Sequence, residues 1–223
     1  MAESIPPVPG GFGCFGKLPG AGDFVSRRMP HAVQQFWDGW CAEGVDAMKA
    51  ASPASGLEVW GATPAWGFVV PAQPGVATAQ LGVLVPSCDR VGRVFPFLVV
   101  APFGTDLQPV MLDFAAQLGL AWCEAVTLAQ EAKMGIDAVD ARLQAALADT
   151  LAIEPAQDED EDEGATLPLG LSPPSLPWPD LGHTFDPGGS ESYWWSVPPA
   201  DTGFQTRVHT GPLRTVHFLD LCR

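Results

Sequence analysis

The spacing of apolar positions predicts a long amphipathic helix near the start of the chain. After Met29-Pro30, apolar side chains recur at steps of three and four as far as Met48. Proline is favoured at a first helical position, so we expect the helix to begin there. The apolar positions are Val33, Phe36, Trp37, Trp40, Cys41, Val45 and Met48. We interpret their aromatic side chains as core packing; a ligand pocket formed by Trp37 or Trp40 is the alternative.

Short β-rich runs interrupted by Gly and Pro predict a sheet in the middle of the chain. The connections between these runs have lengths that suit an antiparallel meander. Residues 95–100 are apolar almost throughout, so we expect a central strand that is covered on both faces. The predicted strands are residues 12–17, 58–61, 65–70, 80–85 and 94–101.

Two more helices are expected after the sheet. Thr105 or Asp106 can cap a helix that ends near Lys133, and a second helix follows from Asp137. Two helices joined by a tight turn should pack as an antiparallel pair against the sheet. The second helix would turn Val139, Leu143, Leu147 and Leu151 inward. Residues 192–197 and 213–219 alternate like strands and are expected to rejoin the sheet.

These elements predict an α/β (α+β) fold, a three-layer sandwich with a mainly antiparallel central sheet and helices on both faces. The 223 residues are compatible with one domain spanning 1–223. No run approaches the ~20 apolar residues that span a bilayer, so we expect no membrane insertion. The N-terminus does not look like a secretory signal, and five cysteines without a C-x-x-C pair favour a reducing cytoplasm.

Negative charge is concentrated in the second half of the sequence. Residues 1–100 have a net charge of −1 and residues 101–223 a net charge of −14. Six consecutive acids fill residues 158–163, and a Pro-rich segment follows, so residues 154–187 are expected to form a mobile loop. The alternative role for this loop is a docking tail for a basic partner surface. Acidic surfaces repel nucleic acid, which makes a protein the expected partner.

A Gly-rich stretch from Gly11 to Arg28 is the most unusual part of the sequence. Its glycines and proline predict a shaped loop. The dinucleotide pattern G-x-G-x-x-G and the first part of the P-loop pattern both lie within residues 11–17. However, Leu18 replaces the required hydroxyl, and Pro19 with the following glycines prevents the phosphate-binding helix. A phosphate- or nucleotide-handling enzyme that uses the loop around Lys17 is therefore the alternative function.

Charged side chains gather in this stretch and in a second loop between two predicted strands. They are Lys17, Asp23, Arg27, Arg28, Asp89, Arg90 and Arg93. Two roles are open: an ion-pair network that joins the loops, or guanidinium groups presented to the carboxylates or phosphates of a partner. Arg90 beside Asp89 should lower the pKa of that carboxyl, which makes it a poor general acid. The histidines lack ligand spacing, and nucleophile motifs are absent, so no metal, cofactor or catalytic residue is expected.

Three motifs occur in order along the chain. They are Gly16-Lys17-Leu18-Pro19 with Gly22-Asp23-Phe24-Val25 and Arg27-Arg28-Met29-Pro30, then the run over 86–96, then Ser192-Tyr193-Trp194-Trp195. Together they resemble the TagF family of type VI secretion-associated proteins. The resemblance implies a cytoplasmic, non-enzymatic protein that represses type VI secretion after translation by binding the forkhead-associated scaffold protein. It leaves open which surface meets the partner and whether the chain is monomeric.

Overall fold

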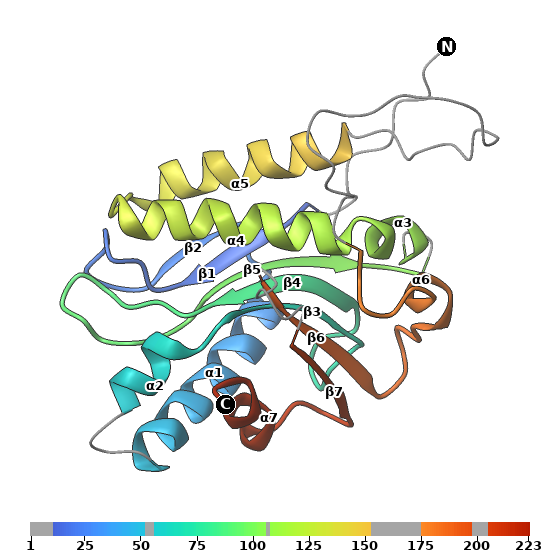
Figure 1. The fold of residues 1–223 in the computed structure, drawn as a ribbon, viewed down its shortest axis with the longest axis horizontal. Coiled ribbons are helices and arrows are strands. Elements are labelled where there is room, and N and C mark those ends of the chain that lie inside the picture. The colour runs from blue at the N-terminus through green and yellow to red at the C-terminus, as the bar shows by residue number, and fades with distance from the viewer. Residues whose placement is uncertain (1–10, 52–55, 106–107, 153–174, 198–204) are drawn as a thin grey trace.

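The computed structural model describes residues 11–51, 56–105, 108–152, 175–197 and 205–223. Its middle layer is a seven-stranded antiparallel sheet with the order β2-β1-β5-β4-β3-β6-β7 (Figure 1). The strands are β1 (Gly13–Gly16), β2 (Val25–Arg27), β3 (Ala65–Val70), β4 (Ala79–Val85), β5 (Phe97–Phe103), β6 (Glu191–Val197) and β7 (Thr206–Thr210).

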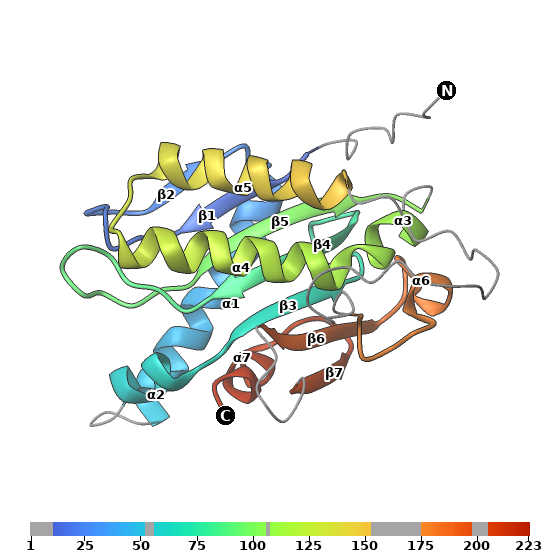
Figure 2. The same cartoon turned by 45° about the horizontal axis from the view of Figure 1, so that its top comes forward.

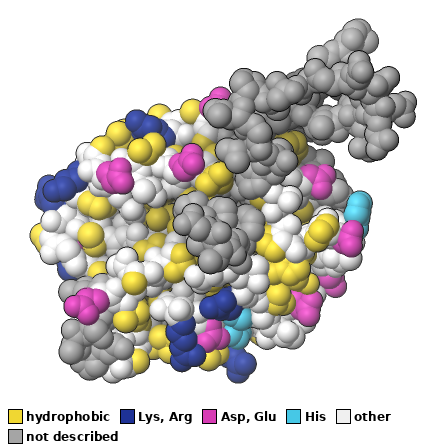
Figure 3. Space-filling model, in the orientation of Figure 1, with side chains coloured by type: hydrophobic (Ala, Val, Ile, Leu, Met, Phe, Trp, Pro, Cys, Tyr) yellow, Lys and Arg dark blue, Asp and Glu magenta, His cyan; other side chains and the backbone are white. Residues whose placement is uncertain are grey.

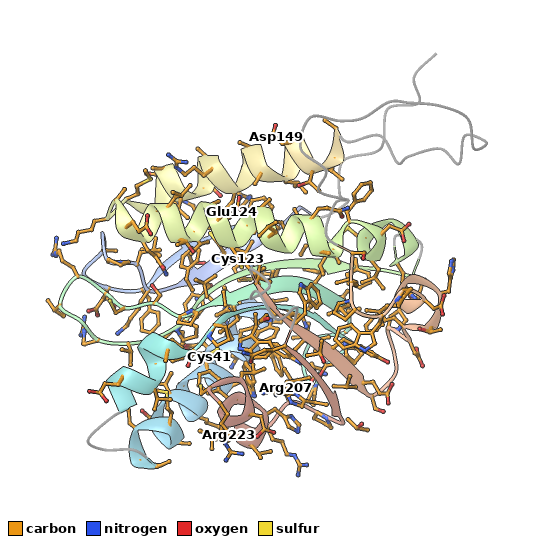
Figure 4. All side chains as sticks on the ribbon, in the orientation of Figure 1. Cys41, Cys123, Glu124, Asp149, Arg207 and Arg223 are labelled. Atoms are coloured by element: carbon orange, nitrogen blue, oxygen red, sulfur yellow. The ribbon has the colours of Figure 1, made fainter. Side chains whose placement is uncertain are left out.

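Helices cover both faces of this sheet, as predicted (Figures 1 and 2). One face carries α1 (His31–Ala51), α2 (Gly56–Ala62) and α7 (Thr215–Leu221), and the other carries α4 (Ala115–Glu131) and α5 (Ile136–Leu151). The short helices α3 (Gln108–Asp113) and α6 (Leu181–Thr184) pack on each other at one end. Cys41 in α1 and Cys123 in α4 lie on opposite sides of the sheet (Figure 4). All five cysteines are free thiols.

The core has two halves because successive residues of a strand face opposite layers. In β5, Phe97 and Val99 pack under α4, whereas Leu98 and Val100 pack against the α1 side. This confirms the expected central strand that is buried on both faces. On the α1 side, Trp37 is fully buried and its Nε1 donates to Gln80 Oε1 at 2.7 Å, so its aromatic ring belongs to the core.

Two short segments that were predicted as strands are helical. Residues 58–61 lie in α2, where Trp60 is buried while its neighbours Glu58 and Gly61 are exposed. Most of residues 213–219 lies in α7, whose buried side chains His217, Phe218 and Leu221 follow helical spacing. Runs this short contain too few apolar positions for a period of two to be told from a period of 3.6.

The predicted helix from Thr105 to Lys133 is interrupted at Phe114, so that α3 and α4 are separate helices. Its alternative cap Asp106 lies outside the described residues, as do the acids at 158–163. Two strands at the edges of the sheet, β2 and β7, were not predicted from the sequence. Among the described helices, none is both long and apolar enough to cross a membrane.

Candidate functional site

A buried carboxylate joins the two charged loops. Asp89 lies in the β4–β5 loop, and its side chain is fully buried. Its Oδ2 accepts Lys17 Nζ at 3.2 Å and Arg93 Nε at 2.6 Å. Its Oδ1 accepts the backbone N–H groups of Val91 and Arg93 at 3.1 and 2.9 Å. Four donors therefore satisfy this carboxylate, which buried charges require.

Backbone contacts strengthen the same connection between the loops. Ser87 Oγ donates to the carbonyl of Lys17 at 2.7 Å, and the Arg90 N–H donates to the carbonyl of Ala21 at 2.8 Å. Arg93 Nη2 donates to the carbonyl of Gly22 at 2.8 Å. Two side chains and one backbone N–H of the β4–β5 loop thus satisfy carbonyls of the β1–β2 loop.

The pKa of Asp89 lies well below the usual range for aspartate. Burial alone would raise this pKa, but hydrogen bonds from the backbone and side chain of Arg93, from Lys17 and from the Val91 N–H outweigh it. The expected direction of the shift is confirmed, while the expected cause is wrong. Arg93, four residues along the turn, lowers this pKa in place of the adjacent Arg90.

A third loop, the α4–α5 turn, closes onto the first two. A Cβ atom placed on Gly20 would come within 2.4 Å of the carbonyl oxygen of Lys133 and closer still to that of Met134, so this position accepts only glycine. Gln130 Nε2 at the end of α4 donates to the Pro86 carbonyl at 3.1 Å. We call this assembly of residues 17–24, 86–96 and 130–135 the loop junction.

Arg27 and Arg28 bind carboxylates that the sequence analysis missed. Arg27 pairs with Asp137 at 2.5 Å. Arg28 forms a two-pronged pair with Asp140, with Nη1 to Oδ2 at 2.7 Å, and its guanidinium lies 4.9 Å from the centre of the Phe12 ring. The available signal was an adjacent Arg-Arg pair and two aspartates three apart in the first turns of a predicted helix.

The remaining two predicted site residues, Asp23 and Arg90, form no ion pair within the described part of the chain. Asp23 accepts the N–H of the next residue, Phe24, at 2.8 Å and is exposed. The Arg90 guanidinium lies over Gly22, where an added Cβ would be 3.0 Å from its Nη2. The network therefore unites Lys17, Asp89 and Arg93 and leaves Arg90 exposed at its surface.

The surface of the loop junction combines cations with exposed apolar side chains. Phe24 is 44% exposed and Val91 at the tip of the β4–β5 turn is 71% exposed. The Phe24 ring packs edge-on against Phe95, and Lys17 Nζ lies 5.1 Å from its centre. Lys and Arg side chains are visible along the left edge of Figure 3, the end of the molecule at which these loops meet in Figure 1.

The Gly-rich loop does not have the geometry of a phosphate-binding loop. β1 ends at Gly16, a turn follows, and the next helix begins only at His31, so no helix N-terminus faces the glycines. The Lys17 ammonium group is bound to Asp89. Among the described residues, no three His, Cys, Asp or Glu side chains come together as a metal site would require.

Comparison with known proteins identifies the family. Residues 13–150 match the model of the TagF N-terminal domain, described as type VI secretion system-associated. The chain belongs to the TagF family. The motifs at the loop junction lie within the matched region, whereas Ser192-Tyr193-Trp194-Trp195 lies beyond it, in β6.

A solved structure is similar to this chain along nearly its whole length. The chain is similar to PA0076 from Pseudomonas aeruginosa PAO1, with 28% sequence identity and a TM-score of 0.61. The similarity covers 95% of this chain and 93% of the other. A comparison with curated proteins gave no match. This TagF family member is thus a type VI secretion-associated protein.

Proposed function

We propose that this protein is a cytoplasmic, non-enzymatic repressor of type VI secretion that acts after translation by binding the forkhead-associated scaffold protein of the system. Membership of the TagF family supports the link to secretion. The observation that carries the proposal is the loop junction. Hydrogen bonds and ion pairs between its loops hold this surface together, and Arg90 is exposed on it without an ion pair among the described residues.

The geometry of the junction favours binding over catalysis. Lys17 and Arg93, which an enzyme would need for phosphate chemistry, are bound to the buried Asp89. Those contacts hold the loops in one conformation before a partner arrives, and a preorganised surface loses less entropy on binding. Titration with ATP, GTP and Mg²⁺ by calorimetry should accordingly give no heat of binding.

Arg90 suits a contact that selects a partner by charge. The chain has a net charge of −15, so most of its surface repels acidic proteins at long range. An exposed arginine beside the apolar side chains of Phe24 and Val91 reverses that preference locally. Such charges mainly set the orientation and rate of encounter, while neighbouring apolar contacts provide affinity. The partner surface is therefore expected to carry carboxylates.

Arg90→Glu tests this proposal without disturbing the buried network. The Arg90 N–H to the Ala21 carbonyl is a backbone contact that the substitution keeps. Affinity for the purified scaffold, measured by calorimetry, should fall roughly tenfold or more because like charges would now face each other. Secretion in cells that carry this variant should rise, and its circular dichroism spectrum should remain native.

Arg223→Glu is the matched control. Arg223, the last residue, is also an exposed arginine and pairs with Asp220; Figure 4 places it at the lower middle of the molecule, whereas the junction loops meet at the left end, and its substitution makes the same change in net charge. This variant should bind and repress like the wild type. Normal scaffold binding and repression by a folded Arg90→Glu protein would show that the contact lies elsewhere. Failure of the wild-type protein to bind the scaffold would overturn the proposed function itself.

A further inference from the structure

A hollow of about 310 Å³ opens beside the β4–β5 turn. Residues of four segments line it: the start of the β1–β2 loop, the end of α2, the β4–β5 loop and the end of α4. Figure 1 shows these segments at one end of the molecule. Its lining is mainly apolar and includes Pro19, Trp60, Gly61, Pro86, Cys88 and Val94.

The polar groups around this hollow bind one another, so they shape it without facing a ligand. Trp60 Nε1 donates to the Ser87 carbonyl at 2.8 Å, and Ser87 Oγ donates to the Lys17 carbonyl at 2.7 Å. Gln130 Nε2 donates to the Pro86 carbonyl. These contacts tie all four segments around the hollow together. A preformed site with an apolar lining is suited to an apolar side chain.

The hollow lies close to the cations of the loop junction. Gly92 lines it, and the turn from Asp89 to Arg93 is closed by the Gly92 N–H donating to the Asp89 carbonyl at 2.9 Å. Arg90 and Arg93 are on the other side of this turn, over Gly22. An extended peptide advances about 3.3 Å per residue, so a segment of a few residues can reach from the hollow across this turn.

We propose that the hollow receives one apolar side chain of the scaffold protein, from a segment that places a carboxylate against Arg90. This inference rests on the proposed function and adds the chemistry of the bound segment. Charge complementarity supports it, because Arg90 is an exposed cation on the turn beside the hollow and the chain as a whole has a net charge of −15. Protein interfaces commonly place an apolar anchor residue in a pocket and surround it with polar or charged contacts.

Gly61→Leu tests the hollow by filling it. Gly61 lies in α2, lines the hollow and is exposed, and a Cβ atom added there meets no atom within 4 Å. Leucine is also a better helix former than glycine, so the fold should be retained. Affinity for the scaffold should fall about tenfold or more, since the anchor would then meet an occupied site.

Gly39→Leu is the matched control. Gly39 is an exposed glycine in the helix α1, and an added Cβ atom there also has open space. It does not line the hollow, so this variant should bind like the wild type. Equal affinity of the two leucine variants, both folded by circular dichroism, would overturn the inference and leave the proposed function intact.

Cys88 provides a second measurement that needs no substitution. It is a partly buried free thiol in the wall of the hollow, and Cys222, which is also free and partly buried, lies outside it. With scaffold at about ten times Kd, roughly nine tenths of the protein is bound, so alkylation of Cys88 should slow about tenfold relative to Cys222. Alkylation of Cys88 at an unchanged relative rate in the complex would overturn the inference even if Gly61→Leu failed to fold.

Salt separates the charged part of the inference from the apolar part. Scaffold affinity should fall as sodium chloride is raised, because exposed charges are screened. This salt dependence should be weaker in Arg90→Glu. An affinity that does not change with salt would exclude the flanking carboxylate. If no wild-type complex forms, this inference is overturned together with the proposed function.

Discussion

Two groups of ion pairs combine the same kinds of charge in different surroundings, one at the loop junction and one where β2 meets α5. At the loop junction, the Asp89 carboxylate is fully buried and accepts two cations and two backbone N–H groups. Where β2 meets α5, the carboxylate of Asp137 is 88% exposed and that of Asp140 is 19% exposed, and each pairs with one arginine. The two groups therefore differ in how deeply their carboxylates are buried.

This difference in burial predicts different roles for the two groups: the first assembles the site, and the second supports the neighbouring helix α5. A buried charge that loses its partner is strongly destabilising, because water cannot replace the lost contacts. An exposed pair is weak, since water and salt screen both charges. We therefore expect the Asp89 network to determine whether the loop junction forms, and the arginine pairs to adjust how α5 lies beside β2.

The largest effect is expected from Asp89→Ala. This change removes the acceptor of two backbone N–H groups and leaves the Lys17 ammonium group, whose side chain is 9% exposed, without its carboxylate. The Tm should fall by roughly 10 °C. Differential scanning calorimetry provides the measurement. A Tm within error of the wild type would show that this network does not stabilise the fold.

Low pH should remove the extra stability that ionised Asp89 gives the fold compared with an uncharged residue. Because its pKa is lowered in the folded protein, its ionised form stabilises the fold fully above the ordinary aspartate pKa of about 4, and this contribution is lost as pH falls through the folded-state value. The difference in unfolding free energy between wild type and Asp89→Asn should be constant from about pH 5 to 8 and shrink below about pH 4. Urea unfolding of both proteins across this pH range provides the measurement. A free-energy difference that shrinks near neutral pH would contradict the lowered pKa of Asp89.

Arg28→Ala should have a smaller effect. The Arg28 side chain is 42% exposed, binds Asp140 with both terminal nitrogens and covers the Phe12 ring. Loss of the pair and of the ring contact should reduce the unfolding free energy by about 1 kcal/mol. Arg28→Lys would keep the charge without the two-pronged geometry and should recover part of the loss. Urea unfolding of both variants checks this order, and equal stabilities of Arg28→Lys and Arg28→Ala would show that the charge itself adds nothing.

Arg27→Ala should have the smallest effect of the four. Its partner Asp137 is almost completely exposed, so the pair competes with water at every orientation. The Tm should not change beyond experimental error, and the small contribution should disappear at high salt. A loss of stability as large as that of Asp89→Ala would show that the two groups of ion pairs do not differ in their contribution.

The sequence by itself determined the elements with long, regular patterns. The positions between Val33 and Met48 repeat over several helical turns, residues 65–70 lie between Pro64 and Pro71, and residues 80–85 end before Pro86; each of these predictions was confirmed. The motifs around Lys17 and Asp89 pointed to the correct family and to the loops that lie together. Local patterns suffice here because the periods and turn residues act over neighbouring positions.

Only the tertiary structure decided which charges meet. Arg27 and Asp137 are 110 positions apart, and nothing local to either residue selects the other. Arg93 and Asp89 are only four positions apart, yet the sequence did not decide between Arg93 and the adjacent Arg90, which stays exposed. Lys17 and Trp60 both bond to the same serine, Ser87, and Gln130 bonds to Pro86, so the hollow exists only once four segments have folded together. Pairing of charges and the shape of a cavity depend on packing between distant segments, and packing follows from the whole chain rather than from any one stretch of it.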